Sequence, residues 1–236
     1  MTTTFSALVT RIQTTINDSG AATWSTAEIA SFLNDAIRDY SNHFPRIMTD
    51  SITLTNGTQE YDLNTDYMGV LSVEYPDGES PREFLKRRPY TQGNGADFFG
   101  LDGYYDILKR DDDDDNEAQI VFSEDLVTDE TAVVEYTAHH ALIANTASIS
   151  GDCTVIPQHQ HLLVKFCAWQ ATLYLKSAEE QAPTSNSSLL MAQLAQNARR
   201  LALDYSTALQ QAIYSADGES RSINWITPES GMERIY

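Results

Sequence analysis

The sequence predicts an α+β fold: an antiparallel-type helical bundle of two N-terminal and two long C-terminal helices, an inserted small antiparallel β barrel or sandwich module, and an extended C-terminal tail. Apolar residues recur at the helical period toward both ends of the 236-residue chain and at a period of two in its middle. Acidic residues are concentrated in the same middle part. We therefore expect a helical bundle at residues 1–48 and 152–215, an acidic β module at 49–151 and an arm at 216–236.

Two amphipathic helices are expected before residue 48. One apolar stripe defines the first helix: Phe5, Leu8, Val9, Ile12 and Ile16. The second helix begins with a capping box, because Ser25 is a good N-cap and Glu28 follows three residues later, and Pro45 ends it. Its buried face is expected to contain Ile29, Phe32, Leu33, Ala36, Ile37 and Tyr40. Two short helices cannot bury both stripes alone, so we expect them to pack against the C-terminal helices.

From Ser51 onward the apolar period changes to two. The stretch SITLTNGTQEYDL predicts a β-hairpin, because Asn56-Gly57 accepts the positive φ angles of a tight type I′ turn. Further strands are expected at 69–75, 104–110, 118–124 and 131–139. Short strands separated by loops rich in Gly, Pro and Asp favour a small barrel or sandwich.

Helical periodicity returns after Pro157. One helix is expected to continue to about Ala182, and the last to run from about Ser188 to Ser215. The apolar side of the last helix contains Leu190, Leu194, Ala198, Leu201, Tyr205, Ala208, Leu209 and Ile213. Gly, Pro and Ser in the tail predict that it is not helical, although it carries unperiodic apolar residues. The tail either folds back on its own bundle or is a partly disordered end, or it is an arm that lies against a neighbouring subunit.

Charge placement restricts the function. Residues 51–150 hold 21 acidic and 6 basic residues, whereas the segments on either side each have a net charge of −2. A strongly acidic surface repels nucleic acid phosphates and anionic lipid, so tight DNA binding is disfavoured. The nearly neutral ends can be buried against partners at low desolvation cost. The N-terminal stretch has no basic start or apolar run, so a cytoplasmic chain with Cys153 and Cys167 reduced is expected, and no apolar stretch is long enough to span a membrane.

The sequence contains no recognisable catalytic constellation, and neither an enzyme, a cofactor nor a metal site is expected. The acidic run at 111–117 is interpreted as a solvated hairpin tip, because a calcium loop starting at Asp113 would place Ala118 where the backbone needs glycine. The series of Cys153, His159, His161 and Cys167 matches no zinc spacing. The basic stretch KRRPY at 86–90 is expected to neutralise nearby acids or to dock an acidic partner.

Several stretches resemble the head–tail adaptor (connector) proteins of tailed bacteriophages. The resemblance rests on WSTAEIASFLNDAIRDY, SITLTNGTQEYDL, MGVLSVEY, AVVEYTAHH and HLLVKFCAWQATLYL, and covers most of residues 1–215. It implies a structural virion protein that forms a twelve-fold ring beneath the portal protein, extends the DNA channel and presents a platform to downstream tail or neck proteins. DNA would pass through without specific binding.

The resemblance also suggests site residues. Portal or neighbouring subunits are expected to contact Ile223, Trp225, Ile226, Arg234, Ile235 and Tyr236. An acidic channel or outer surface is expected to contain Asp111, Asp112, Asp113, Asp114, Asp115 and Glu117. A tail-completion or stopper ring protein of the same neck is an alternative. From a different class, a calcium- or glycan-binding β module is suggested by the acidic run together with the aromatic stretch DFFGLDGYYD.

Overall fold

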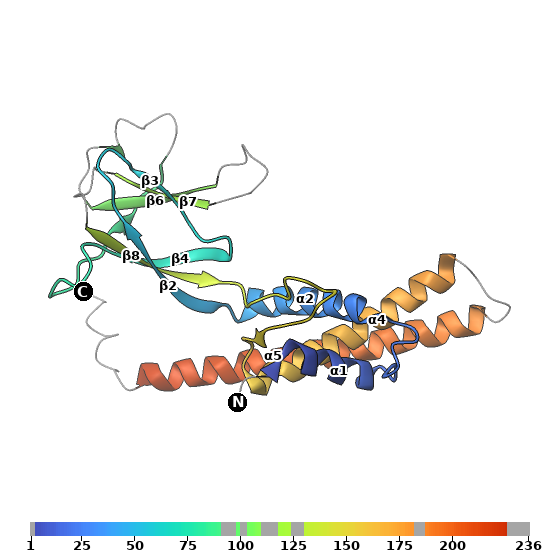
Figure 1. Ribbon diagram of the computed structural model, residues 1–236. Coiled ribbons are helices and arrows are strands. Elements are labelled where there is room, and N and C mark those ends of the chain that lie inside the picture. Colours follow the sequence, from blue (N-terminus) through green and yellow to red (C-terminus); the bar gives the residue numbers. More distant parts are fainter. Residues whose placement is uncertain are drawn as a thin grey trace. The chain divides into compact units, whose positions relative to one another are not determined.

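The chain divides into two compact units in a computed structural model (Figure 1). The structure describes residues 3–90, 98–99, 103–109, 118–123, 130–181 and 187–225, and the side chains of all of these except 109 and 217–225. The helical unit comprises Met1–His43 and His140–Tyr236, and the β unit comprises Phe44–His139. Residues 140–151, which the sequence assigns to the β module, belong to the helical unit, and the β unit begins before residue 49.

The helical unit contains α1 (Phe5–Thr15), α2 (Thr26–His43), the short 3₁₀ helix η1 (Pro157–His159), α4 (Gln160–Gln181) and α5 (Ser187–Trp225), with a two-stranded sheet of β1 (Thr3–Thr4) and β9 (Asp152–Cys153). The predicted capping box of the second helix is confirmed. Ser25 N donates to Glu28 Oε2 over 2.8 Å, and Glu28 N donates to Ser25 Oγ over 3.2 Å. None of the described helices combines the length and the hydropathy needed to cross a bilayer.

The core of the helical unit lies around α4, which packs against α1, α2 and α5. The buried stripes of these helices are apolar at the helical period, and include Phe5, Leu8, Ile12, Ile29, Leu33, Ile37, Leu162, Leu163 and Cys167. Phe32, expected in the buried face of α2, is only half-buried. Burial raises the pKa of the Cys167 thiol, so this cysteine is an unreactive apolar residue of the core.

Residues 140–143, which follow the β unit in the chain, are held to α2 by hydrogen bonds. Asn34 Nδ2 donates to Ile143 O over 3.0 Å, and Ile143 N donates to Asn34 Oδ1 over 2.8 Å. His140 N donates to Ser41 Oγ over 3.0 Å. Desolvation raises the pKa of Tyr40 to about 12, so its hydroxyl is protonated. This hydroxyl lies 2.8 Å from His159 Nδ1. The amide of Asn34 therefore satisfies both backbone groups of the buried Ile143, as the pairing within a sheet would do.

The loop between α1 and α2 is organised by one carboxylate. Asp18 accepts hydrogen bonds from the backbone N–H groups of Ala22, Thr23 and Trp24, the last over 2.7 Å. These bonds fix Trp24, which is itself buried. The backbone hydrogen bonds, of which that of Trp24 is the strongest influence, lower the pKa of Asp18.

We expect the Asp18→Asn variant to lose part of the acid sensitivity of the helical unit. Because the folded-state pKa is depressed, the stabilisation from the charged Asp18 is present above the unfolded-state pKa of about 4 and is lost as the pH falls through the lower folded-state pKa. Thermal unfolding followed by circular dichroism between pH 7 and 3 should show a smaller drop in melting temperature for the variant than for the wild type. Equal drops would contradict this role.

The β unit consists of two sheets with a shared interior. One sheet has the antiparallel order β2-β8-β4, formed by β2 (Arg46–Thr53), β8 (Thr131–Ala138) and β4 (Tyr67–Glu74). The other has the order β3-β7-β6-β5, formed by β3 (Glu60–Asp62), β7 (Ala118–Phe122), β6 (Tyr104–Lys109) and β5 (Lys86–Arg87), in which only β5 pairs in parallel. The predicted α+β class with antiparallel sheets is confirmed. The described strands of the β unit form two open sheets and no closed barrel.

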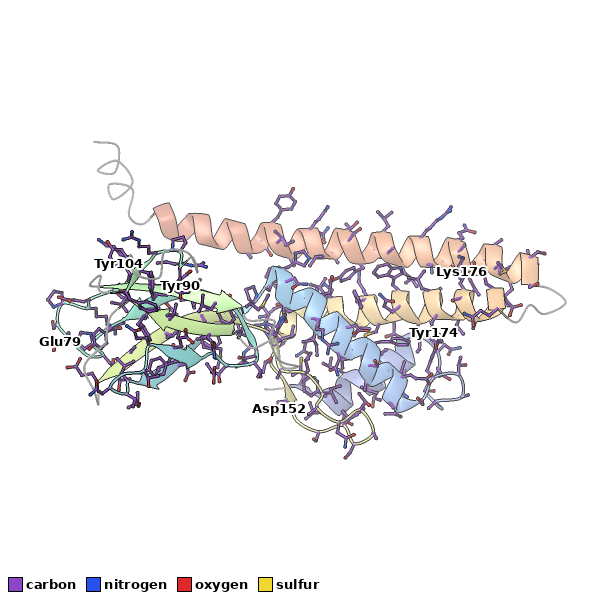
Figure 2. All side chains as sticks on the ribbon, turned by 90° about the horizontal axis from the view of Figure 1, so that it is seen from above. Glu79, Tyr90, Tyr104, Asp152, Tyr174 and Lys176 are labelled. Atoms are coloured by element: carbon purple, nitrogen blue, oxygen red, sulfur yellow. The ribbon has the colours of Figure 1, made fainter. Side chains whose placement is uncertain are left out.

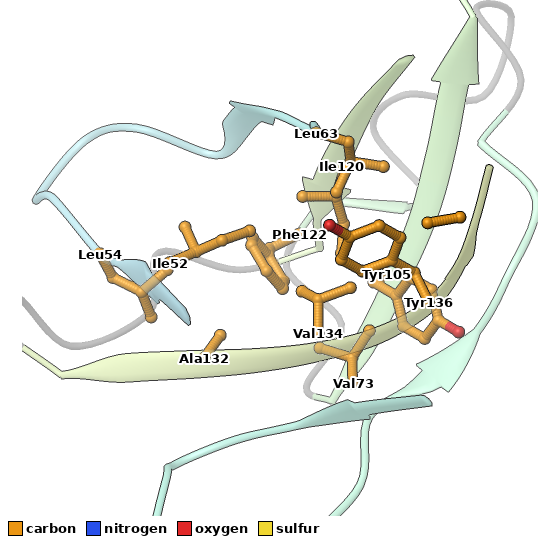
Figure 3. Packing of buried hydrophobic residues seen from close by; sticks show 11 residues of the cluster. Ile52, Leu54, Leu63, Val73, Tyr105, Ile120, Phe122, Ala132, Val134 and Tyr136 are labelled. Carbon is orange, nitrogen blue, oxygen red and sulfur yellow. The ribbon is translucent and has the colours of Figure 1, made fainter. Parts of the chain in front are cut away.

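Residues from both sheets form one core in the β unit (Figure 3). Alternate residues of β8 point into it, as the period of a strand with one buried face requires. The cluster contains Ile52, Leu54, Leu63, Val73, Tyr105, Ile120, Phe122, Ala132, Val134, Tyr136 and Ala138. Phe122 is fully buried in this cluster, and its ring meets that of Tyr61 edge to face with centroids 5.8 Å apart.

The hairpin predicted at Asn56-Gly57 is wrong. The strands on either side of this turn belong to different sheets, because β2 pairs with β8 whereas β3 pairs with β7. Only Gly57 has a positive φ angle, of 78°, so the turn is not type I′. Tyr61 Oη closes the loop instead, accepting from Thr55 N over 2.8 Å and donating to Thr58 O over 3.0 Å.

The prediction that the last helix ends near Ser215 is also wrong. Helix α5 has 39 residues and continues through Gly218 to Trp225. A single glycine inside a helix costs only about 1 kcal/mol, which does not end a helix, and Pro228 lies beyond the last helical residue. The first ten residues of the predicted arm are therefore helical.

Candidate assembly surface

The helical unit exposes three large apolar side chains on the outer side of α5. At 1.5 Å per residue this helix is about 58 Å long. Leu189, Leu203 and Tyr214 are 65%, 66% and 74% exposed, and their spacings of 14 and 11 residues place them on one side of the helix. The opposite side is buried at Ala198 and Tyr205. We refer to Leu189, Leu203 and Tyr214 as the outer face of α5.

Few charges accompany this outer face. Between residues 187 and 216 the only charged side chains are Arg199, Arg200 and Asp204. A helix surface exposed to water normally carries many charged residues, whereas the centre of a protein interface is depleted of them. The outer face of α5 is therefore poor in charge, although Gln196, Arg200 and Thr207 lie between its three apolar residues.

A groove of about 250 Å³ lies between α4 and α5, which run side by side (Figures 1 and 2). Trp169, Leu173 and Lys176 line it from α4, and small residues line it from α5: Ala195, Ala198 and Ala202, with Arg199 beside them. Lys176 forms an ion pair with Glu180 over 2.8 Å. Within the described part of the chain neither Arg199 nor Arg200 forms an ion pair, so both cations are available to a partner.

An aromatic cluster lies between α2 and α4. The Trp24 ring is 5.5 Å from Phe32 and 5.4 Å from Tyr174 between centroids, both edge to face. Phe32 and Tyr174 are 6.2 Å apart. Trp24 is buried, but Tyr174 is 57% exposed, so the cluster has a buried base and an open edge. We call these three residues the aromatic cluster.

The β unit carries a shallow groove on the outer side of its three-stranded sheet. It has a volume of about 350 Å³ and is lined by Thr49, Ser72, Glu74, Arg82, Phe84, Val133 and Glu135. Arg82 lies 3.6 Å from Glu74. The basic stretch at 86–90 neutralises an acid, as one of its two interpretations expects, because Arg87 Nε donates to the buried Asp106 over 3.1 Å. Arg88 lies over the Tyr104 ring.

The site residues suggested by sequence are only partly within the described structure. The backbones of Ile223 and Trp225 belong to the last turns of α5. Four suggested contact residues lie outside the described residues: Ile226, Arg234, Ile235 and Tyr236. The acidic run also lies outside them: Asp111, Asp112, Asp113, Asp114, Asp115 and Glu117. In the ranges that the structure does describe, no three His, Cys, Asp or Glu side chains are grouped as metal ligands.

Sequence reasoning missed the outer face of α5 and the aromatic cluster. The apolar pattern of the last helix was assigned to a single buried side, which left Leu189, Leu203 and Tyr214 unexplained. The scarcity of charge between residues 187 and 216 was the signal that could have revealed a second apolar side.

Along the described chain, two helices are followed by a β unit and then by two longer helices. The family model for the SU10 adaptor protein matches residues 3–224, and the chain belongs to this family. The resemblance to phage head–tail adaptors is thus confirmed, and the chain is a phage structural protein of the virion that interacts with other head and tail proteins. No curated protein matches the sequence.

Proposed function

We propose that the chain is the head–tail adaptor of a tailed phage, that twelve copies bind beneath the portal protein as a ring, and that the ring extends the DNA channel and carries the platform for downstream tail or neck proteins. Membership of the adaptor family supports this role. The observation that carries it is the outer face of α5, where the exposed Leu189, Leu203 and Tyr214 would gain from burial against a partner, with Arg200 as a charged residue on the same side of the helix. We propose neither a catalytic step nor a cofactor.

The charge of the β unit supports a position beside passing DNA. Residues 44–139 hold 22 acidic and 7 basic residues, a net charge of −15. DNA-binding proteins attach to phosphates through Lys and Arg, so a surface with the opposite charge leaves the genome free to move. We assign this role to the acidic run at 111–117, and portal contact to the C-terminal residues from Ile223 to Tyr236.

Imaging of virions tests the proposal. The chain should appear as a ring in direct contact with the portal, with its helical unit at subunit boundaries. A ring one position further from the head, without portal contact, would instead identify a tail-completion or stopper protein. Virions without the chain, or tight binding of the purified chain to duplex DNA at physiological salt, would contradict the adaptor role.

A further inference from the structure

We infer that the free edge of β2 receives an added strand from a tail or neck protein, and that this strand is an extended segment that carries a Lys or Arg side chain. This inference rests on the proposed function, because it names the surface of the platform and the chemistry of its partner. The described strands of the β unit form two sheets and therefore four sheet edges, of which β2 is one (Figure 1). The other three edges are protected.

Proteins protect sheet edges from pairing with other chains by short strands, bulges, charges or covering segments. At the edges of the four-stranded sheet, β3 has three residues and β5 has two. β4 has two irregularities in its register, and the chain that follows it covers its edge, since Leu85 N donates to Val73 O over 2.9 Å. β2, in contrast, has eight residues in unbroken register with β8.

Half of the backbone groups of β2 point away from β8. Leu54 N donates to Glu130 O over 3.0 Å, and this pair continues the register between the two strands. Because hydrogen-bonded and non-hydrogen-bonded pairs alternate in an antiparallel sheet, the outward groups belong to the odd-numbered residues, Ile47, Thr49, Ser51 and Thr53. Ser51 N donates to Asp50 Oδ1 over 2.9 Å. The N–H groups of Ile47 and Thr49 have no protein partner among the described residues, so this half of β2 is open to a strand.

The sheet face beside this edge carries two carboxylates and one cation. Glu74 is 7% exposed, and its ion pair with Arg82, at 3.6 Å, is longer than a hydrogen bond. Glu135 accepts a hydrogen bond from Ser72 Oγ over 3.1 Å and forms no ion pair among the described side chains. Both carboxylates line the same groove. A second cation is needed to balance them, and the charge of the groove therefore favours a partner with a Lys or Arg side chain.

A strand added to β2 brings such a side chain within reach of the groove. It would lie about 4.8 Å from β2 and about 9.6 Å from β8. Thr49 lies directly beside Glu135 in the register and has a short side chain, so a Lys or Arg opposite Thr49 can extend over it to Glu135. Ile47, two residues earlier on the same face, is 66% exposed and would contact an apolar residue of the partner. In this kind of pairing the main chain supplies affinity and the alternate side chains supply specificity.

The partner is a different protein, because the described part of this chain offers no suitable segment. Its basic residues lie in helices, in strands that are already paired or, as Arg82 and Arg88 do, in contact with Glu74 and the Tyr104 ring. In addition, two β units that each carry a net charge of −15 repel one another.

Joining of tails to heads tests this inference. Heads that carry rings of the full-length wild-type or variant chain are mixed with an excess of purified tails, and joined particles are counted by electron microscopy. Thr49→Pro removes an N–H that points to the free edge and keeps the hydrogen bonds to β8, since proline is tolerated at sheet edges. Glu135→Lys reverses one charge in the groove. We expect each variant to lower the fraction of joined particles at least about tenfold, with an unchanged number of chains per head.

Each variant has a matched control. Thr53→Pro makes the same exchange at the other end of β2, beyond Ser51, whose N–H is already bonded. Glu79→Lys makes the same charge reversal at an exposed residue of the β unit that does not line the groove. Both controls should join tails as the wild type does.

Normal joining by Thr49→Pro or by Glu135→Lys would overturn the inference and leave the adaptor role intact. Fewer chains per head in Thr49→Pro, at an unchanged melting temperature, would show that β2 pairs with a second copy inside the ring, which also overturns the inference. If Thr49→Pro lowers the melting temperature, Ile47→Asp takes its place, because Ile47 is exposed and its backbone is unchanged. If the wild-type chain forms no ring on heads, the proposed function and the inference are both wrong.

Discussion

Replacing Phe122 with alanine is expected to lower the free energy of unfolding of the β unit by about 3–5 kcal/mol. Phe122 is 1% exposed and contributes the largest fully buried side chain of the protein's described residues. Its removal takes away apolar contacts with both sheets and leaves a cavity that their backbones cannot fill by a small shift. Because whole domains are stable by only about 5–15 kcal/mol, the variant should be close to unfolding.

Hydrogen exchange is the appropriate measurement for this variant. All three tryptophans, Trp24, Trp169 and Trp225, belong to the helical unit, so tryptophan fluorescence does not report on the β unit. Exchange of the backbone amides of β7 and β8 should become much faster in Phe122→Ala. The control is Phe84→Ala, the same truncation at a residue that is 54% exposed, for which we expect less than about 1 kcal/mol. Equal effects of the two truncations would contradict the assigned core.

Removing residues 226–236 is expected to weaken attachment to the head by at least about 100-fold, because each buried apolar side chain contributes about 1.5–3 kcal/mol and three of the expected contact residues in this segment are apolar. These are Ile226, Ile235 and Tyr236. The truncation leaves every described residue of α5 in place, so the helical content should not change. Incorporation is measured as the number of copies per purified particle, and folding by circular dichroism.

A full-length control separates the length of this segment from its chemistry. In the control the three apolar residues are replaced by serine, and the same loss of incorporation is expected. Normal incorporation of the serine variant would show that chain length, rather than apolar contact, is needed. Normal incorporation of the truncated chain would remove the C-terminal residues from the contact with the portal.

Local signals in the sequence were sufficient for the helix starts. Ser25 and Glu28 form a capping box whose two hydrogen bonds depend only on residues three positions apart, so sequence spacing alone predicts them. The alternation in β8 likewise depends only on one buried face. In these two elements the deciding contact is local, and the prediction and the structure agree.

Strand pairing could not be predicted from such signals. Asn56-Gly57 is a sound hairpin signal, but β2 pairs along all eight of its residues with β8, about 80 positions later in the chain. That long-range pairing places Ile52 and Val134 in one core, and the turn only has to lead the chain into the second sheet. A turn signal indicates where the chain reverses and cannot indicate which sheet the next strand joins.

The candidate assembly surface was equally beyond sequence reasoning, for a different reason. Whether Leu203 belongs to the core or to an outer face depends on how much of α5 the neighbouring helices cover, and this is a property of the packed unit. The exposed edge of the aromatic cluster depends in the same way on the loop that Asp18 organises, since this loop places Trp24 against Tyr174.

The adaptor role itself is tested most directly by native mass measurement of the purified chain, alone and after mixing with purified portal protein. The account predicts a portal-bound species that carries a fixed number of additional chains, twelve for each complete ring. A portal whose mass is unchanged at chain concentrations well above those of the portal would contradict it.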